Sequence, residues 1–174
     1  MAGLSDSLPP VLSLDALGTL LEMLDPFDAL VAELDARGVP LSREEVTAAL
    51  VEEMTHYRAG MQGAHDAATL HELRLSRTQV LFDGLPERAR ELGFDEVGAA
   101  LSASVRFRPF PEVPETLAEL KERGVRTVVV SNWDISLHEQ LSDTGRTPRS
   151  LSAARVSGTS GKGRTRTEAK SAAP

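Results

Sequence analysis

The feature that most constrains the fold of this chain is a pair of short apolar runs that each end abruptly at polar residues. Val11-Leu12-Ser13-Leu14 is followed by Asp15, and Val128-Val129-Val130 is followed by Ser131-Asn132. Such runs are typical of strands buried in a parallel sheet. Because ligands bind beyond the carboxyl ends of these strands, we expect Asp15 and Ser131 to lie at one site. The backbone N–H groups after Asp15 can cradle an anion there.

The sequence between the two runs has the periodicity of amphipathic helices and no convincing strand. Asp25-Pro26 and the capping box Ser42-Arg43-Glu44-Glu45 mark two helix starts. We predict further helices over residues 66–82, 87–92, 95–104, 114–123 and 135–142. This order predicts an α/β fold, in which a Rossmann-like parallel-sheet core carries an inserted helical cap. The predicted parts are core residues 1–23, a helical cap over 24–107, core residues 108–145 and a tail over 146–174.

The residues at the ends of the two runs form a pair of recognisable motifs. Asp15-Ala16-Leu17-Gly18-Thr19-Leu20 resembles the first motif of the haloacid-dehalogenase-like hydrolase superfamily, and Ser131-Asn132 resembles the second. The resemblance implies that Asp15 attacks a small anionic substrate to form a covalent ester, which water then hydrolyses. It also implies that Thr19, Ser131 and Asn132 bind the substrate and that magnesium is held at Asp15. The lysine and acidic motifs that should follow, including further magnesium ligands, are missing.

Leu17 departs from the phosphatases of this superfamily, which have a second aspartate as general acid/base at this position. Leucine cannot transfer protons, and positioned acid–base catalysis is worth about 10²–10⁴-fold. Our first hypothesis is a hydrolase of small phosphate esters that is impaired by truncation. One alternative is a 2-haloacid dehalogenase-type hydrolase, because halide leaves without a proton; the candidate cap arginines are Arg37, Arg43 and Arg58. The other alternative is a non-enzymatic remnant or binding module.

The composition of the chain changes after Gly145. Residues 146–174 contain seven Lys and Arg and one acidic residue, whereas residues 1–145 contain 12 basic and 25 acidic residues, a formal charge of −13. The tail has too few large apolar side chains to offset chain entropy, so we expect it to be disordered. We favour an out-of-frame replacement for the rest of a catalytic domain over a genuine basic arm. The missing strands would leave a sheet edge uncovered, through which we expect self-association.

Composition and charge exclude several other classes of protein. The sequence contains no cysteine, which rules out disulfides, cysteine-ligated zinc and thiol catalysis. It has no apolar run of membrane-spanning length and no basic segment leading into an apolar one, so we expect a cytoplasmic protein without a membrane partner. The acidic charge of residues 1–145 argues against nucleic acid as a ligand. The four histidines, which we expect to be surface or packing residues, are His56, His65, His71 and His138.

Overall fold

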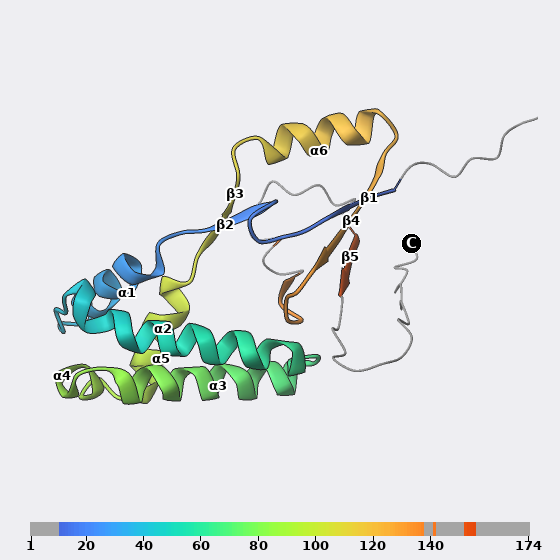
Figure 1. The fold of residues 1–174 in the computed structure, drawn as a ribbon. Helices are drawn as coiled ribbons and strands as arrows, with labels where there is room; N and C mark the ends of the chain where they lie inside the picture. Colours follow the sequence, from blue (N-terminus) through green and yellow to red (C-terminus); the bar gives the residue numbers. More distant parts are fainter. Residues whose placement is uncertain (1–10, 138–140, 142–151, 156–174) are drawn as a thin grey trace, which may run out of the picture. The chain divides into compact units, whose positions relative to one another are not determined.

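The structure, a computed structural model, describes residues 11–137, 141 and 152–155, and these fall into two compact units (Figure 1). The sheet unit comprises the described residues of Met1–Glu22, Pro109–Asn132 and His138–Pro174. The helical unit comprises Met23–Arg108 together with Trp133–Leu137. The predicted cap, residues 24–107, lies entirely within the helical unit.

The sheet unit is built on three parallel strands in the order β1-β4-β5. Strand β1 (Val11–Leu14) pairs with β4 (Arg126–Ser131) in a register that runs from Val11 opposite Arg126 to Leu14 opposite Val129. This pairing of the two apolar runs confirms the predicted α/β fold class with its parallel sheet. Helix α6 (Val113–Glu122) precedes β4 and buries Leu117. Gly124, with a φ of +71°, allows the tight turn between this helix and β4.

Strand β5 (Ser152–Arg155) corrects one expectation about the tail. It pairs with β4 from Val128 opposite Ser152 to Ser131 opposite Arg155. The prediction that residues 146–174 are disordered is therefore wrong for these four residues, while the rest of that range lies outside the described residues. The sequence Ser-Ala-Ala-Arg has little strand propensity, but a parallel ladder is made of backbone hydrogen bonds, and an open strand edge is a template for them.

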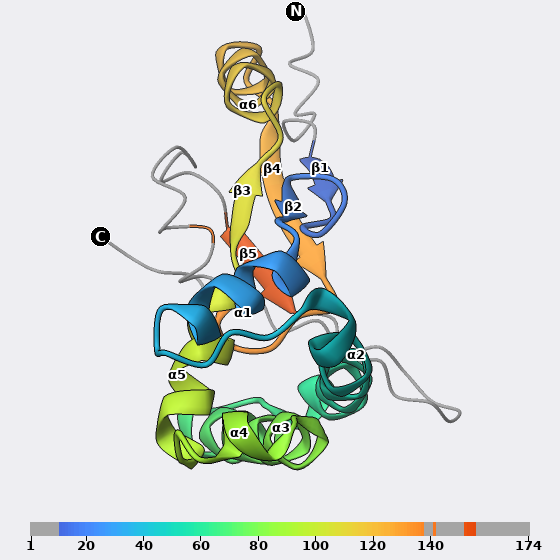
Figure 2. The same ribbon diagram turned by 90° about the vertical axis from the view of Figure 1, so that its left-hand side faces the viewer.

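The helical unit consists of five α-helices and one short 3₁₀ helix within the described residues. They are α1 (Pro26–Asp35), α2 (Arg43–Gly60), η1 (Met61–Gly63), α3 (Ala67–Gly84), α4 (Glu87–Arg90) and α5 (Phe94–Ser104). Both predicted helix starts are confirmed. The Asp25 carboxylate accepts a hydrogen bond of 2.9 Å from the Phe27 N–H, and Ser42 and Glu45 form a capping box. Helices α2 and α3 lie side by side (Figures 1 and 2).

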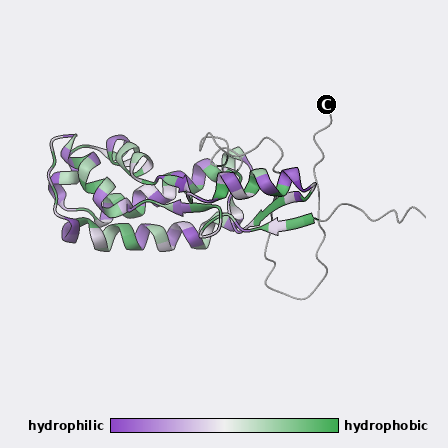
Figure 3. Cartoon of the chain, turned by 90° about the horizontal axis from the view of Figure 1, so that it is seen from above, coloured by the Kyte–Doolittle hydropathy of each residue, from purple (hydrophilic) through white to green (hydrophobic). Residues whose placement is uncertain are grey.

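Apolar side chains from α1, α2, α3 and α5 form the core of the helical unit. Hydrophobic and hydrophilic residues are interspersed along the helices of the chain (Figure 3). The fully buried members include Leu30, Leu34, Val46, Leu50, Leu81, Val97 and Leu101. No helix in the described part of the chain is long and apolar enough to cross a membrane.

Two short strands were not predicted from the sequence. Strand β2 (Leu21–Met23) and strand β3 (Phe107–Pro109) form a two-stranded sheet. Each has three residues, which is too short for the alternation that reveals a strand. The predicted helix over 135–142 is described only in part: residues 135 and 136 form a turn, and Leu137 and Leu141 are helical.

Candidate functional site

The candidate site lies in the sheet unit, at the carboxyl ends of β1 and β4. Asp15 follows the last residue of β1, and Ser131 is the last residue of β4. The register sets Leu14 beside Val129, which brings Asp15 level with Val130 and one residue short of Ser131. Two residues that are distant in the sequence therefore end neighbouring parallel strands, which is where ligands bind in an open α/β sheet.

Asp15 presents an exposed side chain at this edge of the sheet. Its Oδ1 accepts a hydrogen bond of 2.8 Å from the backbone N–H of Ala16, the next residue. This bond fixes one carboxylate oxygen close to the backbone. Because the side chain is exposed, a substrate in solvent can reach the carboxylate, as a nucleophile requires.

The turn after Asp15 closes on its own backbone. The carbonyl of Ala16 accepts hydrogen bonds from the N–H groups of Leu20 at 2.9 Å, Leu21 at 2.8 Å and Thr19 at 3.4 Å. Gly18 adopts a φ of +82°, which favours glycine, and its N–H donates to the carbonyl of Leu21 at 2.8 Å. The expected cradle of backbone N–H groups is therefore occupied within the turn at residues 18–21. Binding an anion here falls mainly to side chains.

Hydroxyl and amide side chains are available for that role. Thr19 is exposed in the turn, Ser131 is 6% exposed at the end of β4, and Asn132 is exposed just beyond it. Leu17, at the position of the phosphatases' second aspartate, is 44% exposed. The edge of the sheet therefore offers one carboxylate, two hydroxyls and an amide, together with the apolar side chain of Leu17.

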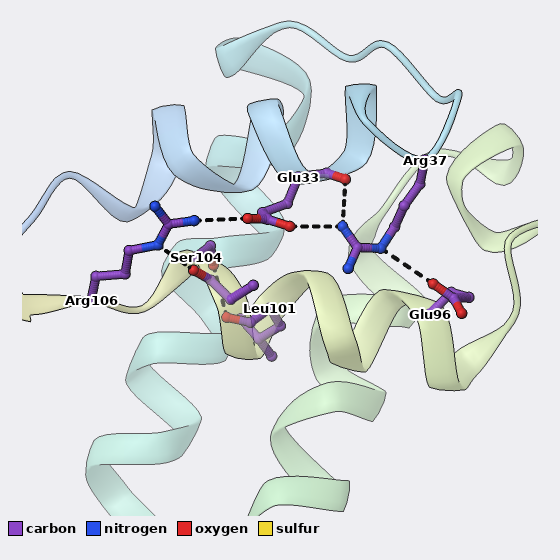
Figure 4. A network of polar contacts seen from close by, with 7 residues as sticks. Glu33, Arg37, Glu96, Leu101, Ser104 and Arg106 are labelled. Carbon is purple, nitrogen blue, oxygen red and sulfur yellow. Dashed lines mark hydrogen bonds and ion pairs between the residues drawn. The ribbon is translucent and has the colours of Figure 1, made fainter. Parts of the chain in front are cut away.

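Two of the three candidate cap arginines are engaged in ion pairs inside the helical unit. Arg37 pairs with Glu33 at 2.8 Å and with Glu96 at 3.3 Å, in a network that Figure 4 shows. These partners raise the pKa of Arg37. Arg37 therefore serves to join α1 to α5, and it is a poor candidate for holding a substrate carboxylate.

Arg43 is likewise engaged, and Arg58 is exposed. The Arg43 guanidinium pairs with Asp25 at 2.8 Å and with Asp28 at 2.5 Å, and lies 5.0 Å from the centre of the Phe27 ring. Arg58, in the last turn of α2, is exposed. Of the three arginines, Arg37 and Arg43 are held in ion pairs, whereas Arg58 is exposed.

The described residues do not assemble a magnesium site. In residues 11–137, 141 and 152–155, no group of three or more His, Asp or Glu side chains could hold a metal ion. A magnesium ion is held by convergent oxygen ligands, and Asp15 alone does not supply them. Among the described histidines, His56 contacts Ser76 at 2.6 Å and His65 contacts the carbonyl of Gly63 at 2.6 Å. His138 lies outside the described residues.

A buried polar group in the helical unit was missed from the sequence. Three contacts connect it. Glu53 of α2 forms an ion pair with Arg77 of α3, Arg77 lies over the ring of Tyr57 of α2, and the Tyr57 hydroxyl donates a hydrogen bond to Asp134. Glu53 is 1% exposed and Asp134 is 3% exposed. The i, i+4 spacing of Glu53 and Tyr57 places both on the face of α2 that also carries Val46 and Leu50. A charged residue on this apolar face is the sequence signal that could have revealed the buried polar group.

Comparisons with known proteins found several solved structures that resemble this chain. No protein-family model matches the sequence, and no curated protein matches it. Among solved structures, a dehalogenase shares 22% identity at a TM-score of 0.46, covering 88% of this chain and 64% of the dehalogenase. A hydrolase from Pseudomonas syringae shares 16% identity at a TM-score of 0.36, and the match covers 85% of this chain and 60% of the hydrolase.

A third similar structure is a phospho-aspartyl intermediate analogue of phosphoserine phosphatase, with 22% identity and a TM-score of 0.35, covering 88% of this chain and 59% of the phosphatase. The chain thus spans less than two thirds of the length of these structures. At these values the fold class rests on the chain's own parallel strands, and the site rests on its own residues.

Proposed function

We propose that this chain is a hydrolase that uses Asp15 as a nucleophile on a small anionic substrate. The observation that carries the proposal is the exposed carboxylate of Asp15 at the end of β1, beside the end of β4 where Ser131 lies. Two motifs that are weak when taken singly occur together at one edge of one sheet. Neighbouring strands that end in an acid and a hydroxyl match the residue types that nucleophilic displacement on an anion requires.

The proposed reaction has two steps at Asp15. The free carboxylate oxygen forms a bond to the reacting phosphorus or carbon atom, and the leaving group departs with its bonding electrons. Water then hydrolyses the resulting ester, which releases the product and returns the carboxylate. Thr19, Ser131 and Asn132 hold the anionic part of the substrate through their hydroxyl and amide groups, which can donate hydrogen bonds.

A small phosphate ester is the first substrate class, and a 2-haloacid is the second. Leu17 favours the second, because an alkoxide leaving group needs a proton whereas a halide does not. With leucine at this position, we propose that hydrolysis of phosphate esters is slow, since positioned acid catalysis typically contributes about 10²–10⁴-fold. Magnesium, which the superfamily resemblance implies, does not fit the described residues, so neither proposed step involves it.

A paired assay tests the proposal. The purified chain is assayed with p-nitrophenyl phosphate and with 2-chloropropionate, each with and without added magnesium, beside the variants Asp15→Asn and Asp35→Asn. Asp35 is an exposed carboxylate at the end of α1, so its replacement controls for loss of charge. We expect measurable turnover that Asp15→Asn abolishes and Asp35→Asn preserves. Turnover that survives in Asp15→Asn, or no turnover of either substrate, would overturn the proposal.

The nature of the preferred substrate follows from the same assay. Faster turnover of the phosphate ester would support the hypothesis that the chain is a phosphatase, and faster release of chloride would support the hypothesis that it is a dehalogenase. Mass spectrometry of the chain, quenched during turnover, should find the added substrate group on the peptide that contains Asp15. An adduct on any other peptide would contradict the proposed nucleophile.

A further inference from the structure

The segment that directly follows the candidate site residues packs within the helical unit. Ser131 and Asn132 belong to the sheet unit, whereas Trp133–Leu137 belongs to the helical unit. Asn132 is therefore the last residue before the chain passes from one unit to the other. The backbone of Ser131 is held on one side by the pairing of β4, so the anchoring of Trp133–Leu137 decides how firmly it is held on the other.

Asp134 is the polar anchor of this segment. It is 3% exposed, and both of its carboxylate oxygens have partners: Oδ2 accepts a hydrogen bond from the hydroxyl of Tyr57, and Oδ1 accepts one of 2.7 Å from the N–H of Ser136. A buried carboxylate is costly unless its oxygens are hydrogen-bonded. The hydroxyl of Tyr57 is the partner from another element, so it ties Asp134 to α2.

Apolar and backbone contacts support the same anchor. The ring of Trp133 packs against Phe107, with ring centres 5.0 Å apart and planes inclined by 60°. The N–H of Ile135 donates to the carbonyl of Ala64 at 3.4 Å, and Leu137 is 5% exposed. The segment is thus held at three successive residues from three different parts of the helical unit.

Tyr57 is itself held in place by a second pair of residues. The guanidinium of Arg77 lies over the Tyr57 ring, 4.6 Å from its centre, and the Nε of Arg77 forms an ion pair with Glu53. Glu53 and Tyr57 are one helical turn apart on α2, so Arg77 of α3 bridges both. This arrangement fixes the ring and directs its hydroxyl at Asp134.

We propose that Tyr57 and Asp134 are positioning residues for Ser131 and Asn132. The Tyr57–Asp134 hydrogen bond holds the residues after Asn132, and so keeps the candidate substrate-binding pair in one conformation at the end of β4. This inference rests on the proposed function for the role of Ser131 and Asn132 in binding. The anchoring itself is independent of any activity.

The variant that tests the anchor is Tyr57→Phe, which removes the hydroxyl and keeps the ring beneath Arg77. The control variant is Thr55→Ala, which removes an exposed hydroxyl from the same helix, where it bonds only the carbonyl of Val51 among the contacts that the structure shows. Amide hydrogen exchange is measured by mass spectrometry over residues 131–137. Loss of one buried hydrogen bond should make these amides exchange roughly three- to tenfold faster in Tyr57→Phe. Thr55→Ala should match the wild type.

Trp133 supplies an independent optical readout, because it is the one tryptophan of the chain. Its fluorescence should become more accessible to acrylamide in Tyr57→Phe and in Asp134→Asn, and should stay unchanged in Thr55→Ala. Circular dichroism shows whether each variant remains folded. If Asp134→Asn does not fold, Tyr57→Phe alone decides. Unchanged exchange over 131–137 and unchanged quenching in a folded Tyr57→Phe variant would overturn the anchor.

Kinetics separate this inference from the proposed function. With the substrate that the wild type turns over, Tyr57→Phe should raise KM several-fold and change kcat by less than about twofold, because a binding pair is displaced while Asp15 is not. An unchanged KM alongside faster exchange would overturn the positioning role. If the wild type turns over neither substrate, the proposed function fails and the positioning role fails with it, while the exchange and quenching results still decide the anchor.

Discussion

Arg77 of α3 forms an ion pair with Glu53 of α2, whose side chain is only 1% exposed. Apart from this pair, the described residues offer the two carboxylate oxygens of Glu53 no hydrogen-bond partner. Burial raises the pKa of the Glu53 carboxyl, and the charge of Arg77 opposes that rise. The ionised form of Glu53 in the folded chain therefore depends on Arg77.

Removing Arg77 should destabilise the helical unit strongly at neutral pH. Arg77→Met leaves a buried carboxylate without its counter-charge, and breaking a buried pair in this way typically costs about 3–5 kcal/mol. Urea unfolding at pH 7 measures the loss. The double variant Glu53→Leu with Arg77→Met is the control, because it removes the unpaired charge and should recover most of the free energy of unfolding.

The loss of stability in Arg77→Met should depend on pH, and the pKa of Glu53 fixes the direction of that dependence. A carboxyl whose folded pKa is raised favours folding below its unfolded pKa, and the advantage is lost as the pH rises towards the folded pKa. The ordinary pKa of glutamate is 4.5, and without Arg77 the folded value rises further. The deficit of Arg77→Met relative to wild type should therefore be smaller at pH 4.5 than at pH 7. Equal deficits would contradict the assignment.

Two glycines at helix ends should respond differently to alanine. A Cβ added at Gly84 would lie 2.8 Å from the Cβ of Ala49 and 3.1 Å from its Cα, so α2 and α3 would have to separate. A Cβ at Gly60 would meet the Cδ1 of Leu73 at 2.6 Å, but that is the end of a flexible side chain. We expect Gly84→Ala to lower the thermal midpoint clearly and Gly60→Ala to change it little. The reverse order would show that the α2–α3 contact is loose.

The sequence predicts the elements that depend on local chemistry and misses those that depend on distant partners. Asp25 and Ser42 act as caps because their side-chain oxygens reach N–H groups two or three residues away. Strand β5 forms at the open edge of β4, and no feature of the sequence Ser152–Arg155 predicts a strand there. Likewise, Tyr57 and Asp134 are 77 residues apart and meet only in the folded chain, so no sequence pattern predicts their contact.

The candidate site divides in the same way. Asp15 and Ser131 could be placed at one edge because parallel strands share a direction, which is a rule about topology. The hydrogen bonds that close the turn on Ala16 could not be foreseen, because they depend on the backbone conformation around Gly18. Ion pairing of Arg37 and Arg43 was also beyond the sequence, since any exposed carboxylate could have been their partner.

Acid should weaken the start of α1. Hydrogen bonding to Arg43, and less strongly to the N–H groups of Asp28 and Phe27, holds the pKa of Asp25 below its ordinary value of 3.8. A depressed pKa contributes stability above the unfolded value that is lost as the pH falls through the folded value. Wild type should therefore lose more stability below pH 3.8 than Asp25→Asn, in which the asparagine can still cap the helix. Parallel acid titrations followed by circular dichroism test this, and identical curves would contradict it.

Leu17→Asp should increase the hydrolysis of phosphate esters. The side chain at this position is 44% exposed, so an aspartate can be accommodated, and it would supply the proton that an alkoxide leaving group needs. We expect a gain of about 10²-fold or more in kcat for an alkyl phosphate such as β-glycerophosphate, whose alkoxide leaving group needs a proton, measured as released inorganic phosphate. Leu17→Asn, which has a similar shape but no proton to transfer, is the matched control. A similar gain in both variants would show that polarity, and not proton transfer, limits the reaction.

The free edge of β1 should make the chain self-associate. Strand β1 pairs with β4 on one side, and no strand in the described part of the chain pairs with its other side. Val11 is 58% exposed and Leu12 is 39% exposed, so this edge is both apolar and available for backbone pairing.

Size-exclusion chromatography over a range of concentrations should show species larger than the monomer. Val11→Lys should shift the population towards the monomer, because a lysine on an edge strand opposes pairing. Val51→Lys, at a residue that is 49% exposed on α2, is the control and should leave the association unchanged. A wild-type chain that stays monomeric at every concentration, or equal effects of the two lysines, would mean that β1 is not the associating edge.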